Sequence, residues 1–223
     1  MPILTGHARL AGILGWPVAH SRSPLLHGTW LERHAIDGAY MPLPVRPERF
    51  ADAVRSLRDL GFRGANVTIP HKEAAFAVCD AVDATARRAG AVNTLAFRAD
   101  GLIHGSNTDG FGFLENVRAA SPGWSATAGA AVLLGAGGSA RAIAAALLDA
   151  GAPRVTLVNR TPARAEALAR ALGGPVSVAE RPPLAEAALL VNTTSLGMQG
   201  QPPLTISLAP LPAGAVVADI IYV

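Results

Sequence analysis

The chain has 223 residues, of which 50% are apolar and 16% are charged. This composition excludes a disordered or collagen-like chain, and the length allows one large domain or two small ones. The formal net charge is only +3 and the arginines are scattered, so we expect a solvated surface and no nucleic-acid partner.

Strand and helix patterns alternate along the first half of the chain. Strands are expected at 10–14, 39–45 and 65–69, and helices at 24–34, 47–60, 71–80 and 83–89. The helix at 47–60 has a proline at its start, where proline is favoured. A strand pair at 91–98 and 102–105 is predicted around the turn 99–101, followed by a connecting helix at 110–119.

The second half repeats the alternation more regularly. Strands are expected at 130–134, 154–158, 188–192 and 215–221, with helices at 138–150 and from Pro162 to Leu172, the latter capped by Thr161. Strands separated by helices imply parallel sheets with right-handed crossovers. We therefore expect an α/β protein of two domains, residues 1–120 and 121–223, divided near the turn 121–123.

The cysteine content and the hydropathy pattern indicate the compartment. A single cysteine, Cys79, excludes an intramolecular disulfide and suits a reducing environment. The N-terminus carries no basic-then-apolar signal, and uncharged stretches such as 119–140 are interrupted by Gly, Pro and Ser. We expect a cytoplasmic protein with no membrane span and no metal site.

A glycine-rich segment follows the predicted strand 130–134 and opens the next predicted helix. It fits G-x-G-x-x-G/A, a dinucleotide-binding pattern, and comprises Gly135, Ala136, Gly137, Gly138, Ser139 and Ala140. Gly135 would make the turn, Gly137 would admit the pyrophosphate, and Ala140 would allow close helix–sheet packing. The pyrophosphate would lie at the helix N-terminus. Glycine runs are also common in plain loops, but here the strand–turn–helix context is present.

The end of the strand 154–158 indicates which dinucleotide binds. An NAD enzyme usually has Asp or Glu there, whereas this chain has Asn159, Arg160 and Thr161, with Arg164 one helical turn further on. Guanidinium groups suit the 2′-phosphate of NADP, so NADP is the expected cofactor. The alternative is that both arginines are ordinary surface residues. Thr193 and Ser195, after the strand 188–192, are further candidates for cofactor binding, although polar residues are common at strand ends.

One basic residue of the chain is a lysine, whereas arginine is used elsewhere. Lys72 is the only lysine in a chain that otherwise uses arginine. Lysine has a compact ammonium group that can lose a proton, which arginine cannot do. Lys72 is therefore a candidate for proton transfer, with chance as the alternative explanation.

Other polar residues of the first half lie at the ends of predicted strands or in the loops that follow. Because ligands of open α/β sheets bind at the carboxyl edge, these side chains could converge on one cleft for a small polyhydroxylated acid. They are Ser21, Ser23, Asn66, Thr68, Lys72, Asn93, Asn107, Thr108 and Asp109. Taken singly, Ser23 and Asp109 could instead cap the helices that follow them.

The motifs together resemble the shikimate dehydrogenase family, from about Leu10 to the end of the chain. They are the segments 20–24 (HSRSP), 66–72 (NVTIPHK), 91–94 (AVNT), 107–110 (NTDG), 159–161 (NRT) and 219–222 (DIIY), together with the glycine-rich segment. The resemblance implies an N-terminal substrate-binding domain followed by a Rossmann-type NADP-binding domain. It also implies reversible NADP-linked oxidation of shikimate to 3-dehydroshikimate in aromatic amino-acid biosynthesis.

The resemblance also implies residue roles. Ser21 and Ser23 would bind the substrate carboxylate, Asn66, Thr68, Asn93 and Asp109 would hold ring hydroxyls, Tyr222 would lie near the substrate, and Lys72 and Asp109 would form the catalytic pair. This pairing is chemically reasonable, because a ketone that accepts hydride becomes an alkoxide and needs a proton, which Lys72 can donate and take back. The cofactor would carry the hydride.

Family members continue beyond the position of Val223, so the C-terminal segment is expected to be missing from this chain. Three alternatives to this function remain. They are a quinate/shikimate dehydrogenase, a non-catalytic NADP-binding or sensor protein, and an inactive truncated fragment. Retention of both Lys72 and Asp109 argues against the sensor. The expected partner is a small-molecule substrate, and the expected assembly is a monomer or homodimer.

Overall fold

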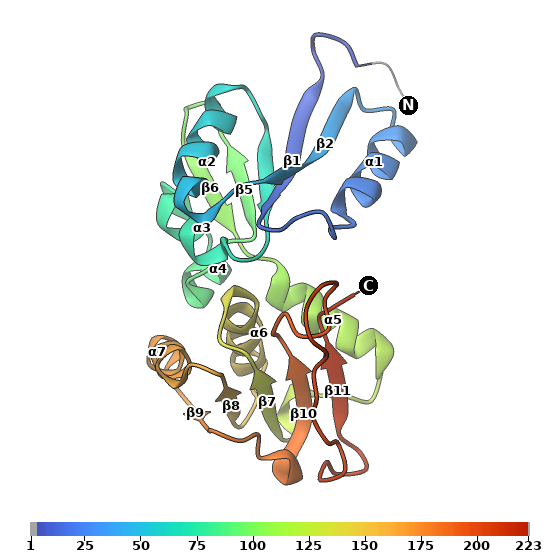
Figure 1. Ribbon diagram of the computed structural model, residues 1–223, viewed down its shortest axis with the longest axis vertical. Helices are drawn as coiled ribbons and strands as arrows, with labels where there is room; N and C mark the ends of the chain where they lie inside the picture. The colour runs from blue at the N-terminus through green and yellow to red at the C-terminus, as the bar shows by residue number, and fades with distance from the viewer. Residues whose placement is uncertain (1–3, 223) are drawn as a thin grey trace. The chain divides into compact units, whose positions relative to one another are not determined.

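A computed structural model, which describes residues 4–222, divides the chain into two compact units (Figure 1). The first extends to Asn107 and the second begins at Thr108. Helix α5 (Asp109–Ala120) packs on α6 (Gly138–Asp149) and so belongs to the second unit by its contacts. The structural division therefore falls before α5, whereas the sequence-based division at 120/121 follows that helix.

The first unit contains a six-stranded sheet in the order β2-β1-β3-β5-β6-β4. Its strands are β1 (Arg9–Gly15), β2 (Gly38–Pro44), β3 (Gly64–Val67), β4 (Ala81–Val82), β5 (Thr94–Phe97) and β6 (Ile103–Ser106). β1 is parallel to β2 and β3, whereas β5 is antiparallel to both β3 and β6. The expected strand pair around 99–101 is thus an antiparallel hairpin. The two-residue β4 was not predicted, because it is too short to show a pattern.

Helices of the first unit agree with the expected ones except at their ends. They are α1 (Ser23–Arg33), η1 (Pro47–Arg49), α2 (Phe50–Asp59), α3 (Lys72–Val78) and α4 (Ala84–Ala89). The helix expected at 47–60 begins as a 3-10 turn, and the one expected at 71–80 ends at Val78 because Cys79 is extended. Asp80 then exchanges hydrogen bonds with Ile103, which extends pairing toward β6. Leu14, Phe50, Val54, Val92 and Leu95 are central to the apolar core.

The second unit contains a parallel five-stranded sheet in the order β11-β10-β7-β8-β9. Its strands are β7 (Ala130–Leu134), β8 (Val155–Val158), β9 (Val176–Val178), β10 (Ala187–Asn192) and β11 (Val216–Asp219), with α7 (Pro162–Leu172) and the 3-10 turns η2 (Ala126–Ala128) and η3 (Leu184–Glu186). This spatial order of the strands is the Rossmann arrangement, and its switch point lies between β7 and β10. The α/β class and the Rossmann-like second domain are confirmed, while the three-residue β9 was not predicted.

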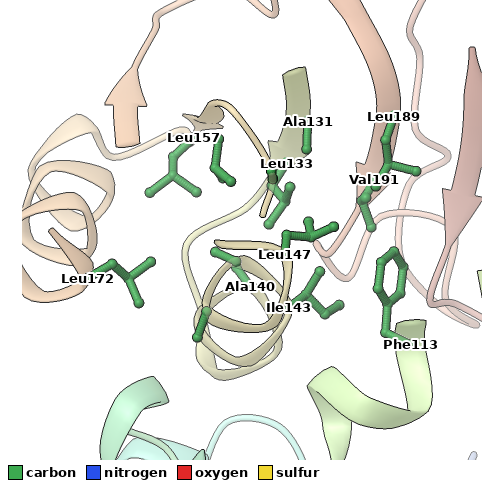
Figure 2. Packing of buried hydrophobic residues seen from close by; sticks show 14 of the residues in the cluster. Phe113, Ala131, Leu133, Ala140, Ile143, Leu147, Leu157, Leu172, Leu189 and Val191 are labelled. Carbon is green, nitrogen blue, oxygen red and sulfur yellow. The ribbon is translucent and has the colours of Figure 1, made fainter. Parts of the chain in front are cut away.

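The core of the second unit fixes α6 against the sheet (Figure 2). Ile143 and Leu147 of α6 lie in one buried cluster with Leu133 of β7 and Leu157 of β8, and Phe113 of α5 belongs to the same cluster. Burying apolar side chains of this size stabilises the fold by roughly 1.5–3 kcal/mol each. The turn between β7 and α6 therefore connects two elements that pack in the same apolar core.

Within residues 4–222, no helix is long and apolar enough to cross a membrane. Over the same residues, no cluster of three or more His, Cys, Asp or Glu side chains could hold a metal ion.

Candidate active site

The glycine-rich turn has the geometry of a phosphate-binding turn. Gly135 has φ +113°, and a Cβ there would lie 2.6 Å from Thr193 Oγ1, so the protein itself requires glycine at this position. Gly137 is different, because it has φ −93° and a Cβ would meet no atom within 4 Å. Ala140 is fully buried, as close helix–sheet packing needs. Space kept open at Gly137 fits a ligand that approaches the backbone.

The N-terminus of α6 adds hydrogen-bond donors to that space. Gly137 is the N-cap residue and supplies no side-chain cap, so the first N–H groups of α6 receive no capping bond from it. Helix N-termini with exposed N–H groups bind phosphates well. These residues therefore fit a dinucleotide pyrophosphate.

The segment after β8 lies beside this turn, because the Gly135 N–H donates to Val158 O at 2.8 Å. Arg160 and Arg164 are both exposed here. Thr161 is the N-cap residue of α7, as expected, but the expected capping bond is absent. Instead the Asn159 amide donates to Thr161 O at 2.8 Å, which shapes the turn that carries Arg160. This end of the site is cationic and open to solvent.

The segment after β10 lies on the other side of the switch point. Ser195 is exposed there. Thr193 is half-buried, and its hydroxyl donates to Leu134 O at 2.6 Å. The Thr193 hydroxyl is therefore directed at the β7 backbone, and cofactor binding by Thr193 stays a prediction.

The capping interpretation of Ser23 and Asp109 is wrong. Ser23 is already the first residue of α1, whose N-cap is Arg22, and Asp109 is the first residue of α5, whose N-cap is Thr108. Neither helix has a side-chain cap at its N-cap residue. Ser21 shapes the loop before α1 by accepting the Ser23 N–H at 3.2 Å. Neither Ser23 nor Asp109 is therefore the N-cap residue of its helix.

Tyr40 on β2 is a site residue that the sequence did not reveal. Its hydroxyl donates to Asn66 Oδ1 at 2.7 Å, and it also shares a hydrogen bond with Ser23. Burial raises the pKa of Tyr40 to about 12, against the smaller opposing effect of the Ser23 bond, so the phenol remains a donor at neutral pH. Its ring stacks on the ring of His27, with 4.0 Å between the two ring centroids. Tyr40 thus joins Ser23 at the start of α1 to Asn66 of β3.

The same network continues to the segment that carries Asn93. Asn66 Nδ2 donates to Thr94 Oγ1 at 3.1 Å, and the Thr94 hydroxyl donates to Asn93 Oδ1 at 2.9 Å. The Asn66 amide is therefore held in one orientation, with identified donor and acceptor ends, and Asn93 Oδ1 is an acceptor. Ser23, Tyr40, Asn66, Thr94 and Asn93 form one connected polar cluster.

Lys72 begins α3 beside this cluster, and its backbone is fixed on two sides. The Lys72 carbonyl accepts the Val92 N–H at 2.9 Å, next to Asn93. The preceding residue, His71, is only 1% exposed, bonds Val45 O through Nε2 at 2.8 Å and donates its backbone N–H to Thr68 O. Lys72, Thr68 and Asn93 are thus brought together in the first unit. Asp109 and Tyr222 belong to the second.

We expect the stability of the folded protein to depend on pH because of the buried His71. Burial lowers the pKa of His71, against the raising effect of its Val45 bond, and burial likewise lowers the pKa of His27. The folded state then binds fewer protons than the unfolded state, so stability is full above the unfolded pKa of 6.5 and is lost as pH falls below it. We expect the urea midpoint to fall between pH 7 and pH 5.

The variant His71→Phe keeps the stacking contact with Phe50 and removes the titrating group. It should show a smaller fall of the midpoint over that pH range than the wild type. Equal falls in the two proteins would show that other groups cause the acid sensitivity.

Comparisons with known proteins match both units. Residues 13–95 match the family model "Shikimate dehydrogenase substrate binding domain", and residues 119–194 match "Shikimate / quinate 5-dehydrogenase". Shikimate dehydrogenase (NADP(+)) of Acidiphilium cryptum is 63% identical over 99% of this chain and 79% of its own length.

Solved structures of shikimate dehydrogenases also superpose on this chain. The shikimate dehydrogenase from Aquifex aeolicus superposes with a TM-score of 0.89 at 34% identity, covering 99% of this chain and 81% of its own. The Thermus thermophilus enzyme, solved in complex with NADP(H) and shikimate, has a TM-score of 0.80 at 38% identity, covering 95% and 78%. The chain thus spans about four fifths of the length of these relatives.

Proposed function

The chain belongs to the shikimate dehydrogenase family, and from that premise we propose that it catalyses the reversible NADP-dependent oxidation of shikimate to 3-dehydroshikimate. This reaction belongs to aromatic amino-acid biosynthesis. The observation that supports it most directly is the combination of Lys72 and an oriented amide and hydroxyl cluster in one unit with an open glycine turn in the other.

The first unit would bind the substrate. Ser21 and Ser23 would hold the carboxylate, Asn66, Thr68, Asn93 and Asp109 would hold ring hydroxyls, and Tyr222 would lie near the substrate. Tyr40 supports this assignment because its bonds to Ser23 and Asn66 connect the carboxylate end to the hydroxyl end. Polar groups preset in this way lose little conformational entropy on binding.

The second unit would bind NADP. The N–H groups at the start of α6 would hold the pyrophosphate, the open side of Gly137 would admit it, and Arg160 and Arg164 would pair with the 2′-phosphate. Ser195 lies on the other side of the switch point, where a dinucleotide extends across the crevice. When bound, NADP supplies hydride transfer with the substrate carbon.

Lys72 and Asp109 would manage the proton. During oxidation the 3-hydroxyl proton must leave as the carbon gives up its hydride, and the Lys72 amine would accept it; in reduction the ammonium would return it. Asp109 would orient the ammonium and the hydroxyl. Arginine at position 72 would stabilise charge but would not relay the proton.

We also propose a cytoplasmic enzyme that acts as a monomer or homodimer. The single cysteine supports a reducing compartment.

The test is formation of NADPH by the 223-residue chain with shikimate, compared with quinate as substrate and NAD as cofactor. Turnover of shikimate with NADP supports the proposal, and faster turnover of quinate would favour the quinate/shikimate alternative. Binding of NADP without turnover of either acid would favour the non-catalytic binding protein or the inactive truncated fragment.

Arg160→Ser tests the cofactor assignment in the same assay. Loss of a charge-assisted bond to the phosphate should lower kcat/KM for NADP about ten-fold or more, with little change for NAD. Arg170→Ser on α7, also exposed, is the matched control. An equal loss with both cofactors would contradict the phosphate role.

A further inference from the structure

The turn after β10 is stabilised by its own side chains and anchored to β11. Asn192 is buried, and its amide nitrogen donates to Asp219 Oδ1 at 3.0 Å, to Oδ2 at 3.1 Å and to Leu196 O at 3.2 Å. Its Oδ1 accepts both the N–H and the hydroxyl of Thr194, at 3.1 and 2.7 Å. Every hydrogen-bonding atom of the Asn192 amide is used to hold the turn.

The turn after β10 also holds the glycine-rich turn between β7 and α6. Thr193 donates twice to the carbonyl of Leu134, the last residue of β7, from its N–H at 2.9 Å and from its hydroxyl at 2.6 Å. The hydroxyl lies 2.6 Å from the place where a Cβ of Gly135 would stand. The peptide between Leu134 and Gly135 is therefore fixed from the β10 side, while the Gly135 N–H is fixed by Val158 O on the β8 side.

We propose that Thr193 is a positioning residue for NADP, which acts by fixing the Leu134–Gly135 peptide, and that the Asn192–Asp219 pair holds it in place. The inference rests on the proposed function, because it concerns the same cofactor site. The orientation of this peptide sets the direction in which the chain enters the turn, and hence where the N–H groups at the start of α6 point. The hydroxyl contributes order to the site without touching the ligand.

The test is the affinity of the full chain for NADP, measured by isothermal titration calorimetry. Thr193→Val keeps the shape and the N–H bond but removes the hydroxyl, and it should weaken NADP binding about ten-fold, the upper range for one hydrogen bond. Thr193→Ser restores the hydroxyl and should bind within about two-fold of the wild type. The kcat at saturating NADP and shikimate should change little in both.

Thr156→Val is the matched control. Thr156 is a buried threonine of β8 whose hydroxyl pairs with Ser177 Oγ at 3.1 Å, so this variant loses a buried hydroxyl of the same sheet away from the turn. It should bind NADP normally even if its melting temperature falls. Weakening by Thr156→Val equal to that by Thr193→Val would show general destabilisation and overturn the proposal.

Asp219→Ala provides a second route that leaves Thr193 intact. It should also weaken NADP binding, and combining it with Thr193→Val should add little further loss, because the two changes relax the same turn. Fully additive losses would contradict the anchoring of Thr193 by Asp219. Normal binding by Thr193→Val, or loss in Thr193→Ser as large as in the valine variant, would refute the positioning role. Absence of NADP binding by the wild type would instead refute the proposed function.

Discussion

Lys72→Ala is expected to lower kcat for shikimate oxidation about a thousand-fold, the range of positioned acid–base catalysis, while the Kd for NADP stays nearly unchanged. Alanine removes the group that exchanges the proton of the reacting hydroxyl. The position is suited to that task because the Lys72 carbonyl is bonded to Val92 N–H and the neighbouring His71 is buried and bonded to Val45 O. The side chain therefore starts from a fixed backbone.

Lys72→Arg separates charge from proton transfer. It retains the positive charge, so it should bind substrate better than the alanine variant, yet kcat should remain far below the wild type because the guanidinium keeps its proton. Asp109→Asn should also lose rate, through disorientation of the ammonium. Steady-state kinetics of the three variants, with NADP affinity measured separately, distinguish these effects.

Arg55→Ala is the control for loss of a basic side chain. Arg55 lies on α2 and is solvent-exposed, with a loose ion pair to Asp52 of 3.8 Å. Exposed pairs of this kind contribute little stability. The kcat of Arg55→Ala should equal that of the wild type. An unchanged rate in Lys72→Ala would end the catalytic assignment of Lys72.

The elements that were predicted well have strong local patterns. The bounds of β7 and α7 agree with the expected 130–134 and 162–172, because an apolar run and a proline start are visible in adjacent residues. The helix starts at Ser23 and Asp109 were misjudged by one residue, since several polar residues in a row offer equivalent caps. Local sequence selects the element more sharply than it selects its first residue.

The contacts that were missed join strands far apart in the sequence. Tyr40 reaches Asn66 because β2 and β3 both pair with β1, where Ala11 lies opposite Tyr40 and Ile13 opposite Asn66. Thr193 reaches Gly135 because β10 pairs with β7, with Asn192 opposite Leu134. Strand order and register decide both contacts, and neither can be obtained from spacing along the chain.

The two glycines of the turn are expected to respond differently to alanine. Gly135→Ala should destabilise the second unit itself, because φ is +113° and the new Cβ would meet Thr193 Oγ1. Gly137→Ala should leave the melting temperature nearly unchanged, since φ is −93° and nothing lies within 4 Å. The same variant should weaken NADP binding about a hundred-fold, because its Cβ would occupy the space needed by the pyrophosphate.

Calorimetric titration with NADP and thermal unfolding without it measure the two effects separately. Gly123→Ala is the control, because a Cβ there also meets no atom within 4 Å and the residue lies outside the glycine turn. It should bind NADP like the wild type. Normal binding by Gly137→Ala would mean that the pyrophosphate does not approach this backbone. A fall in its melting temperature as large as that of Gly135→Ala would mean that Gly137 is required for packing, as Gly135 is.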